Sequence, residues 1–151
     1  MKIINKHNWT FFLITLFWKQ NKWHSHSVLV HTLRVVYFTF KAKQYHMLAA
    51  AFLHDIGKPG SSYQDEEDVL ENIYSFTDHE ELSFQLIKNV SFISTYTKNL
   101  VRYHYLIRDL KNSKARGNYS RYAEKFDIWN SLSPSMQEDL HVFIKLDDRG
   151  K

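Results

Sequence analysis

The residues best suited to chemistry in this sequence are a histidine and an aspartate side by side, His54 and Asp55. They follow the apolar run 47–53 and precede Gly57 and Pro59, which are typical of a helix end. Neighbouring side chains of a regular helix point about 100° apart, but at a relaxed last turn both can reach one cation. Taken alone, such a pair is more often a contact with the helix dipole beside a solvated carboxylate. A metal site therefore depends on which other residues accompany the pair.

Two distant residues, His31 and Asp147, complete a recognisable pattern. The chain resembles the HD superfamily of metal-dependent phosphohydrolases, in which a His on one helix, a His-Asp pair on the next and a distant Asp hold a metal ion. The matching residues are His31, His54, Asp55 and Asp147, and the resemblance spans residues 26–151. It implies a hydrolase in which a metal-activated water attacks a phosphoester.

Within that superfamily, the sequence is most similar to the HD domain of some bacterial CCA-adding tRNA nucleotidyltransferases. The likeness lies in the pair His79-Glu80, in His104 and in the ending 147–151, which reads Asp-Asp-Arg-Gly-Lys. No nucleotidyltransferase domain precedes the motif in this sequence, so we do not expect this chain to be that enzyme. The resemblance implies that the substrate is a phosphomonoester or cyclic phosphodiester of a nucleotide or of an RNA end.

The number of metal ions is the least decided feature of the expected site. Two imidazoles and two carboxylates without sulfur suit Mn²⁺, Fe²⁺, Co²⁺, Ni²⁺, Zn²⁺ or Mg²⁺ and do not identify which. Dinuclear relatives bind a second cation near His79 and His104, but Tyr105 stands where they carry a further histidine. We therefore expect one tight site at the four matched residues. His79 and His104 would then act on the phosphate as hydrogen-bond donors or proton shuttles, or hold a weak second ion.

Three residues are candidates for contact with the water or the phosphate. The resemblance implies that Asp55 both ligates the metal and orients the water. Lys58, one turn later, would neutralise charge on a phosphate oxygen, although a lysine there also balances a helix dipole. Arg34 lies one turn after His31, so it would contact the phosphate or pair with a carboxylate beside the metal.

Composition limits the class of protein. The 151 residues are 44% hydrophobic and 16% aromatic, which is typical of one globular domain with a real core. The absence of cysteine excludes disulfides, thiolate metal sites and cysteine nucleophiles, and it fits a cytoplasmic location. The formal net charge of +4 suits an anionic substrate but not a dedicated duplex-DNA-binding protein. We expect a single HD domain over residues 1–151, with an N-terminal helix within residues 1–22 packed on it.

We expect no association with a membrane. The apolar stretch 11–18 is too short to span a bilayer, which takes about 20 apolar residues. Lys2 and Lys6 precede it as in a signal peptide, but no small-residue cleavage site follows. The stretch is therefore interpreted as part of a core helix.

Helical periodicity accounts for almost every apolar residue, and we find no alternating strand and no internal repeat. The sequence predicts an all-α fold, a compact HD-domain bundle of about six to seven helices. The expected helices cover about 9–19, 26–42, 44–56, 77–89, 94–106 and 133–147, with a short one whose first turn is the acidic run 65–68. In the helix 26–42, Leu33, Tyr37 and Phe40 belong to one apolar stripe, whereas His31 and Val35 share another face.

Local signals predict how three of these segments begin or are broken. Thr77 to Glu80 fits a capping box, which would make His79 either an exposed first-turn residue or a metal ligand. Ser133 and Pro134 fit an N-cap followed by a first helical residue. The basic segment 108–121, interrupted by Gly117, is predicted to be a loop, either solvated or gripping a phosphate backbone.

Two other functions and one assembly stay open. A diiron oxygenase of the same fold would use the six residues His31, His54, Asp55, His79, His104 and Asp147. A degenerate HD domain would bind nucleic acid or another protein through its aromatic and basic surface. Many HD domains continue with further helices after the last Asp, so the site would be open on that side or completed by a second copy in a homo-oligomer.

Overall fold

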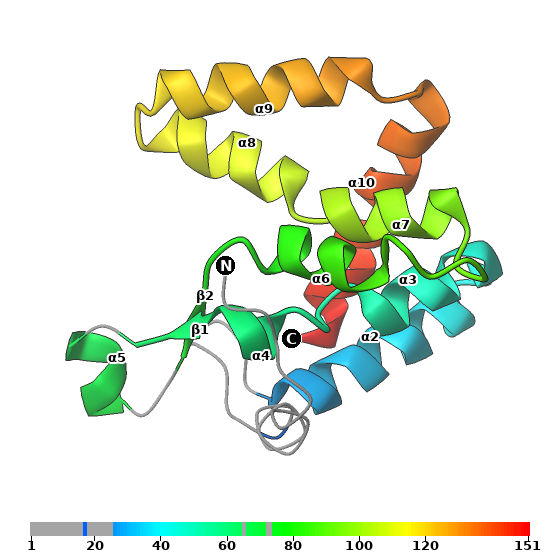
Figure 1. The fold of residues 1–151 in the computed structure, drawn as a ribbon, viewed down its shortest axis with the longest axis horizontal. Helices are drawn as coiled ribbons and strands as arrows, with labels where there is room; N and C mark the ends of the chain where they lie inside the picture. Colours follow the sequence, from blue (N-terminus) through cyan, green and yellow to red (C-terminus); the bar gives the residue numbers. More distant parts are fainter. Residues whose placement is uncertain (1–16, 18–25, 65, 72–73) are drawn as a thin grey trace.

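The computed structural model describes residue 17 and residues 26–64, 66–71 and 74–151 (Figure 1). These residues are predominantly helical, which confirms the predicted all-α class. Within this part of the chain, no helix is both long and apolar enough to cross a membrane. The predicted N-terminal helix, and its packing on the domain, lie outside the described residues apart from Phe17.

The centre of the molecule is formed by helices that are far apart in the sequence. Helix α2 (Val28–Lys41) packs against α10 (Pro134–Gly150) and against α3 (Leu48–Leu53), which follows the 3-10 turn Tyr45–Met47. Helix α7 (Thr95–Tyr103) covers α3 and contacts α10. The core between them contains side chains with no exposed surface, namely Val35, Met47, Ala50, Leu100, Val101, Leu140 and Phe143.

The face that α2 buries is the one that carries His31. His31 and Val35 are almost fully buried against α10, whereas Leu33, Tyr37 and Phe40 of the apolar stripe are more than half exposed. Periodicity found both faces, but it could not tell which one the core takes. The helix starts at a serine cap that was not predicted from the sequence, since the Ser27 side chain accepts from the Val30 backbone N–H.

After α3 the chain turns at residues 54–57 and continues into the short helix α4 (Lys58–Ser61). The sequence missed the next feature, a pair of two-residue antiparallel strands, β1 (Ser62–Tyr63) and β2 (Ser75–Phe76). Between them lies α5 (Glu66–Glu71), the short helix that was predicted at the acidic run. Strands this short leave no alternating pattern to detect.

The capping box predicted at 77–80 does not form. Helix α6 (His79–Ile87) begins after Asp78, which has a left-handed backbone (φ 52°) and makes no side-chain cap hydrogen bond. A left-handed residue turns the chain sharply, which is incompatible with the extended backbone of a normal N-cap. The caps predicted for the last helix are present, because the Ser133 hydroxyl accepts from the Met136 backbone N–H and Pro134 follows it.

The segment 108–121 is not a loop, because most of it is helical. Helix α8 (Leu106–Ala115) and α9 (Tyr119–Ser131) form a hairpin joined at Gly117, whose positive φ of 69° suits glycine. In Figure 1 the hairpin lies as a separate layer above the central helices. Its two helices are linked by a buried carboxylate, Asp109, whose oxygens each accept a hydrogen bond from Arg121. Two of the polar residues that suggested a loop, Asp109 and Arg121, are thus bonded between helices.

Candidate metal centre

Six ionisable side chains meet at the centre of the molecule, one or two from each of several helices. They come from α2, from the turn after α3, from the start of α6, from the residue after α7 and from α10. All are at most 8% exposed, namely His31, His54, Asp55, His79, His104 and Asp147. Burying so many titratable groups together is costly unless they bind one another or a shared ion.

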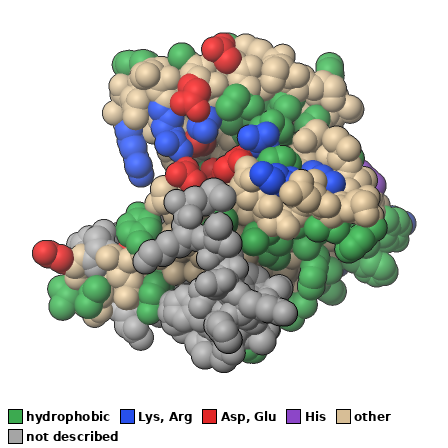
Figure 2. Space-filling view, in the orientation of Figure 1, with side chains coloured by type: hydrophobic (Ala, Val, Ile, Leu, Met, Phe, Trp, Pro, Cys, Tyr) green, Lys and Arg blue, Asp and Glu red, His purple; other side chains and the backbone are tan. Residues whose placement is uncertain are grey.

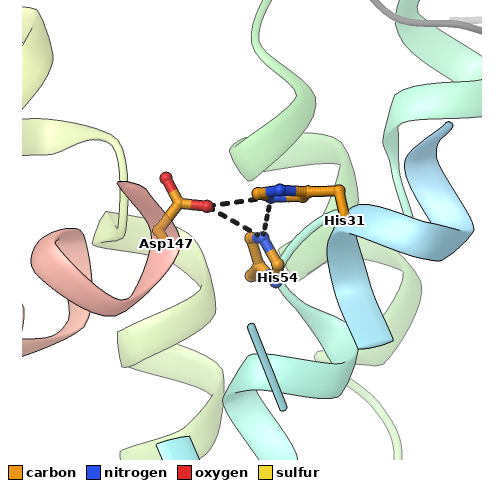
Figure 3. A group of neighbouring side chains, drawn as sticks. All are labelled: His31, His54 and Asp147. Atoms are coloured by element: carbon orange, nitrogen blue, oxygen red, sulfur yellow. Dashed lines mark hydrogen bonds and ion pairs between the residues drawn. The ribbon is translucent and has the colours of Figure 1, made fainter. Parts of the chain in front are cut away.

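The first group contains the four residues predicted to hold the tight metal. His31 Nε2 lies 2.9 Å from Asp147 Oδ1 and 3.3 Å from His54 Nε2, and His54 Nε2 lies 3.4 Å from the same carboxylate oxygen (Figure 3). The Asp55 oxygen Oδ2 lies 3.3 Å from the first imidazole and 3.2 Å from the second. The structure therefore brings the four predicted ligand atoms to one point.

The second group uses the other oxygen of Asp55. That oxygen, Oδ1, lies 3.4 Å from His79 Nε2 and 3.9 Å from His104 Nε2, and these two nitrogens are 3.3 Å apart. His79 is 6% exposed, so it is not the exposed first-turn residue that the sequence allowed. Asp55 thus stands between two sets of imidazoles, with one oxygen toward each.

The hydrogen bonds of the imidazoles show that these groups fit a cation. His54 Nδ1 lies 2.9 Å from the Ala51 carbonyl and His104 Nδ1 lies 2.7 Å from the Val101 carbonyl. Because a carbonyl only accepts, each Nδ1 carries the proton and each Nε2 of a neutral ring presents a lone pair. Those lone pairs face carboxylate oxygens and other imidazoles, so a proton or a metal ion has to lie between them.

The two groups differ in whether they hold a proton when no metal is bound. Burial by itself lowers the pKa of His54, but Asp55 and Asp147 outweigh it and raise that pKa to about 10. Burial would raise the pKa of each of these carboxyls, yet the neighbouring imidazoles, and Lys58 at Asp55, hold them well below their usual range. By contrast, burial lowers the pKa of His104 to about 4, and it also lowers that of His79. The first group therefore traps a proton, while the two imidazoles of the second group stay uncharged at neutral pH.

A buried serine fixes the turn that carries the His-Asp pair. The Ser83 hydroxyl on α6 donates to the His54 carbonyl (2.8 Å) and accepts from the Gly57 backbone N–H (2.9 Å). A Cβ at Gly57 would meet the backbone of α6 at His79 and Ser83, so only glycine allows this approach. The turn of the first group is thus pinned to the helix that supplies His79.

Arg34 binds the end of α10 rather than a carboxylate beside the metal position. Its guanidinium donates to the backbone carbonyls of residues 149–151, the last turn of α10. It therefore caps the helix that carries Asp147, and Gly150 packs against His31 in the same place, where a Cβ would lie 3.1 Å from Nδ1. Contact of Arg34 with a phosphate stays a prediction, and its bonds in this structure favour a role in positioning α10.

A cavity of about 420 Å³ opens onto the ligands. Its walls include Asp55, His79, His104 and Asp147 together with Phe76, Tyr105 and several cations. Lys58, 5% exposed, places its Nζ 2.7 Å from Asp55 Oδ2 and 5.5 Å from the centre of the Phe76 ring. The lysine chosen from the sequence therefore lies at the mouth of the ligand cluster.

Sequence reasoning did not single out Arg108 as a residue of the site. Its guanidinium lies 2.8 Å from Asp147 Oδ2 and 2.8 Å from Asp148 Oδ1, and Lys151 binds the second carboxylate at 2.6 Å. One oxygen of Asp147 thus faces the histidines while the other is held by Arg108. The only sequence signal for Arg108 was the basic character of 108–121. Its partner Asp147 lies 39 residues away, so no local pattern indicates the pair.

Comparison with family models finds the HD domain model over residues 28–146, which is most of the chain. The match covers every candidate ligand except Asp147, which follows it directly. Comparisons with curated proteins and with solved structures found no match. The particular likeness to CCA-adding enzymes therefore stays a prediction.

Proposed function

The chain belongs to the HD domain family, whose superfamily is that of metal-dependent phosphohydrolases, and from this premise we propose a specific activity. The protein hydrolyses a phosphomonoester or cyclic phosphodiester of a nucleotide or an RNA end. The observation that carries the proposal is Asp55, which directs one oxygen to each imidazole pair at the floor of a cavity edged by cations.

The residues would divide the work as follows. A divalent cation at His31, His54, Asp55 and Asp147 would lower the pKa of a water from about 15.7 toward 7 and polarise a phosphoryl oxygen. Asp55, held by Lys58, orients that water toward the phosphorus. The Lys58 ammonium faces the cavity and offsets negative charge that builds on a non-bridging oxygen.

For His79 and His104 the electrostatics favour one of the two roles left open by the sequence. Burial lowers the pKa of both, so neither imidazole carries an extra proton to donate at neutral pH. Their Nε2 atoms and Asp55 Oδ1 instead form a three-donor group suited to an ion. We propose a second, weaker cation there, which would face the phosphate from the other side of Asp55.

The diiron oxygenase remains the second candidate, because the same six side chains would also hold two irons. The cavity favours the phosphohydrolase, since Lys58, Arg108, Lys111 and Lys151 all line it and suit an anionic substrate. Metal analysis separates the two: fewer than two irons per chain after anaerobic purification would exclude the oxygenase.

The proposal is tested with metal-loaded protein against 2′,3′-cyclic nucleotides, nucleoside monophosphates, nucleoside triphosphates and an aryl phosphate. Replacing His54 by Ala should remove most of the metal and lower activity by roughly a hundredfold or more, because it deletes a direct ligand. The matched control is His141→Ala, a histidine on the exposed face of α10. Metal-loaded wild type that is inert toward all four substrate classes would refute the proposal. If His54→Ala still bound nucleic acid or a partner protein as wild type does, a non-catalytic binding module would be favoured.

A further inference from the structure

The basic segment 108–121 supplies one wall of the cavity. Arg108, Lys111 and Asn112 lie three and four residues apart on α8, so they share the helix face that lines the cavity. Lys114 and Arg116 are exposed and do not belong to that lining. In Figure 2, Lys and Arg side chains gather along α8 beside a group of acidic side chains. The basic residues are thus sorted by the helix into a cavity face and a solvent face.

This wall leads away from the ligand clusters. The Tyr105 ring lies 5.5 Å from the His79 ring, and the Arg108 guanidinium carbon lies 6.0 Å from the centre of the Tyr105 ring. Lys111 follows Arg108 after three residues, which is about 4.5 Å farther along the helix axis. A molecule bound at the ligands and extended along α8 would therefore pass an aromatic ring and then reach Lys111.

Among the four cationic side chains that line the cavity, Lys111 is the one that is not paired with a carboxylate of the described residues. Lys58 is paired with Asp55, Arg108 with Asp147 and Asp148, and Lys151 with Asp148. Lys111 is exposed, and within the part of the chain that the structure describes it makes no ion pair. Asn112 beside it adds an uncharged donor.

We propose that Lys111, with Asn112, binds the phosphodiester next to the scissile phosphate. The preferred substrate is then the end of an oligonucleotide rather than a free mononucleotide. This assignment rests on the proposed function and narrows it. The cavity of about 420 Å³ falls in the range of small-molecule sites, roughly 300–1,000 Å³, so it has room for the reacting nucleotide. The nucleoside between the two phosphates would lie along Tyr105.

The experiment compares substrates that differ by one phosphodiester. The probes are 3′-AMP with the dinucleotide ApAp, and 5′-AMP with pApA, so that both chain directions are covered. Lys111→Ala should lower kcat/KM for the preferred dinucleotide about fivefold more than for its mononucleotide, as expected for one partly exposed charged contact. The salt dependence of dinucleotide affinity should also lose about 0.7 of a unit in its logarithmic slope, as for one lost phosphate contact. Lys114→Ala, on the solvent side of α8, should change neither quantity.

An equal loss on mononucleotide and dinucleotide, or an unchanged salt slope, would overturn the assignment while leaving the phosphohydrolase in place. If wild type hydrolyses none of the four probes, the phosphomonoesterase part of the proposed function fails, and calorimetric binding of ApAp and 3′-AMP then decides whether Lys111 contacts the added phosphodiester. If Lys111→Ala binds ApAp more weakly than wild type does, but binds 3′-AMP equally well, the assignment is upheld. Equal binding of ApAp by wild type and variant would reject it.

Discussion

At the scale of single residues, the site is organised by carboxylates whose two oxygens have different partners. Asp55 gives one oxygen to each imidazole pair, and Asp147 faces the histidines with one oxygen and Arg108 with the other. A carboxylate held on its outer oxygen cannot rotate, so its inner oxygen stays aimed at the metal position. Arg108 is therefore a positioning residue for a ligand as well as a wall of the cavity.

Lys58 offers a test of chemistry that is separate from metal binding. Replacing it by Met keeps much of the buried stem but removes the ammonium that lies against Asp55. We expect kcat to fall roughly 10²-fold or more, because the charge that offsets the developing phosphate charge is gone. Metal content, measured by mass spectrometry, should stay near that of wild type. Loss of metal in parallel with activity would instead assign Lys58 to holding the ligands in place.

At the scale of elements, ligands were easier to predict from the sequence than the residues that hold them. The His-Asp pair, His31 and Asp147 carry their chemistry in residue type and order along the chain. Ser83 and Arg108 hold backbone or carboxylate groups that lie 26 to 40 residues away, so no local pattern points to them. Helix α8 was mistaken for a loop for the same reason, since the partner of Asp109 lies on the next helix.

The packing of α10 on α2 should also control the metal site. Gly150 lies against Val35 and His31, and a Cβ there would press on both side chains. We expect Gly150→Ala to shift His31 and to weaken metal affinity by roughly tenfold, the lower end of what displaced supporting residues cause. Calorimetric titration with the metal measures this. Arg149→Ala, an exposed neighbour on the same helix, is the matched control and should bind metal like wild type. Equal metal affinity in both variants would show that α2 shifts to accommodate the added Cβ without moving the His31 imidazole.

At the scale of the whole molecule, the buried charges link the metal to folding stability. The helices that meet at the site come from both ends of the described chain, α2 and α3 near its start and α10 at its end. An ion that binds only the folded arrangement stabilises it by mass action. Removal of the metal by a chelator should therefore lower the melting temperature of the entire domain, and the size of that effect should depend on pH.

The direction of this pH dependence follows from the imidazoles. In the metal-free protein the raised pKa of His54, about 10 against an unfolded value of 6.5, contributes stability that is complete below pH 6.5. That contribution is lost as the pH rises toward 10. The lowered pKa of His104, about 4, contributes stability that is present above pH 6.5 and lost below it. Stability without metal should therefore be greatest near pH 6.5 and decline on the alkaline side.

Metal binding reverses the alkaline decline, because a ligating imidazole gives up the proton that His54 otherwise keeps. We expect the difference in melting temperature between metal-loaded and chelator-treated protein to grow steadily from pH 6.5 to pH 9. The double variant His54→Ala/Asp147→Ala should show almost no difference at any pH, while His141→Ala should follow wild type. Calorimetric scans at four or five pH values measure this. A difference in melting temperature that is constant across the range would mean that the metal displaces no proton from the cluster. The inference that His54 is protonated in the metal-free protein would then be wrong.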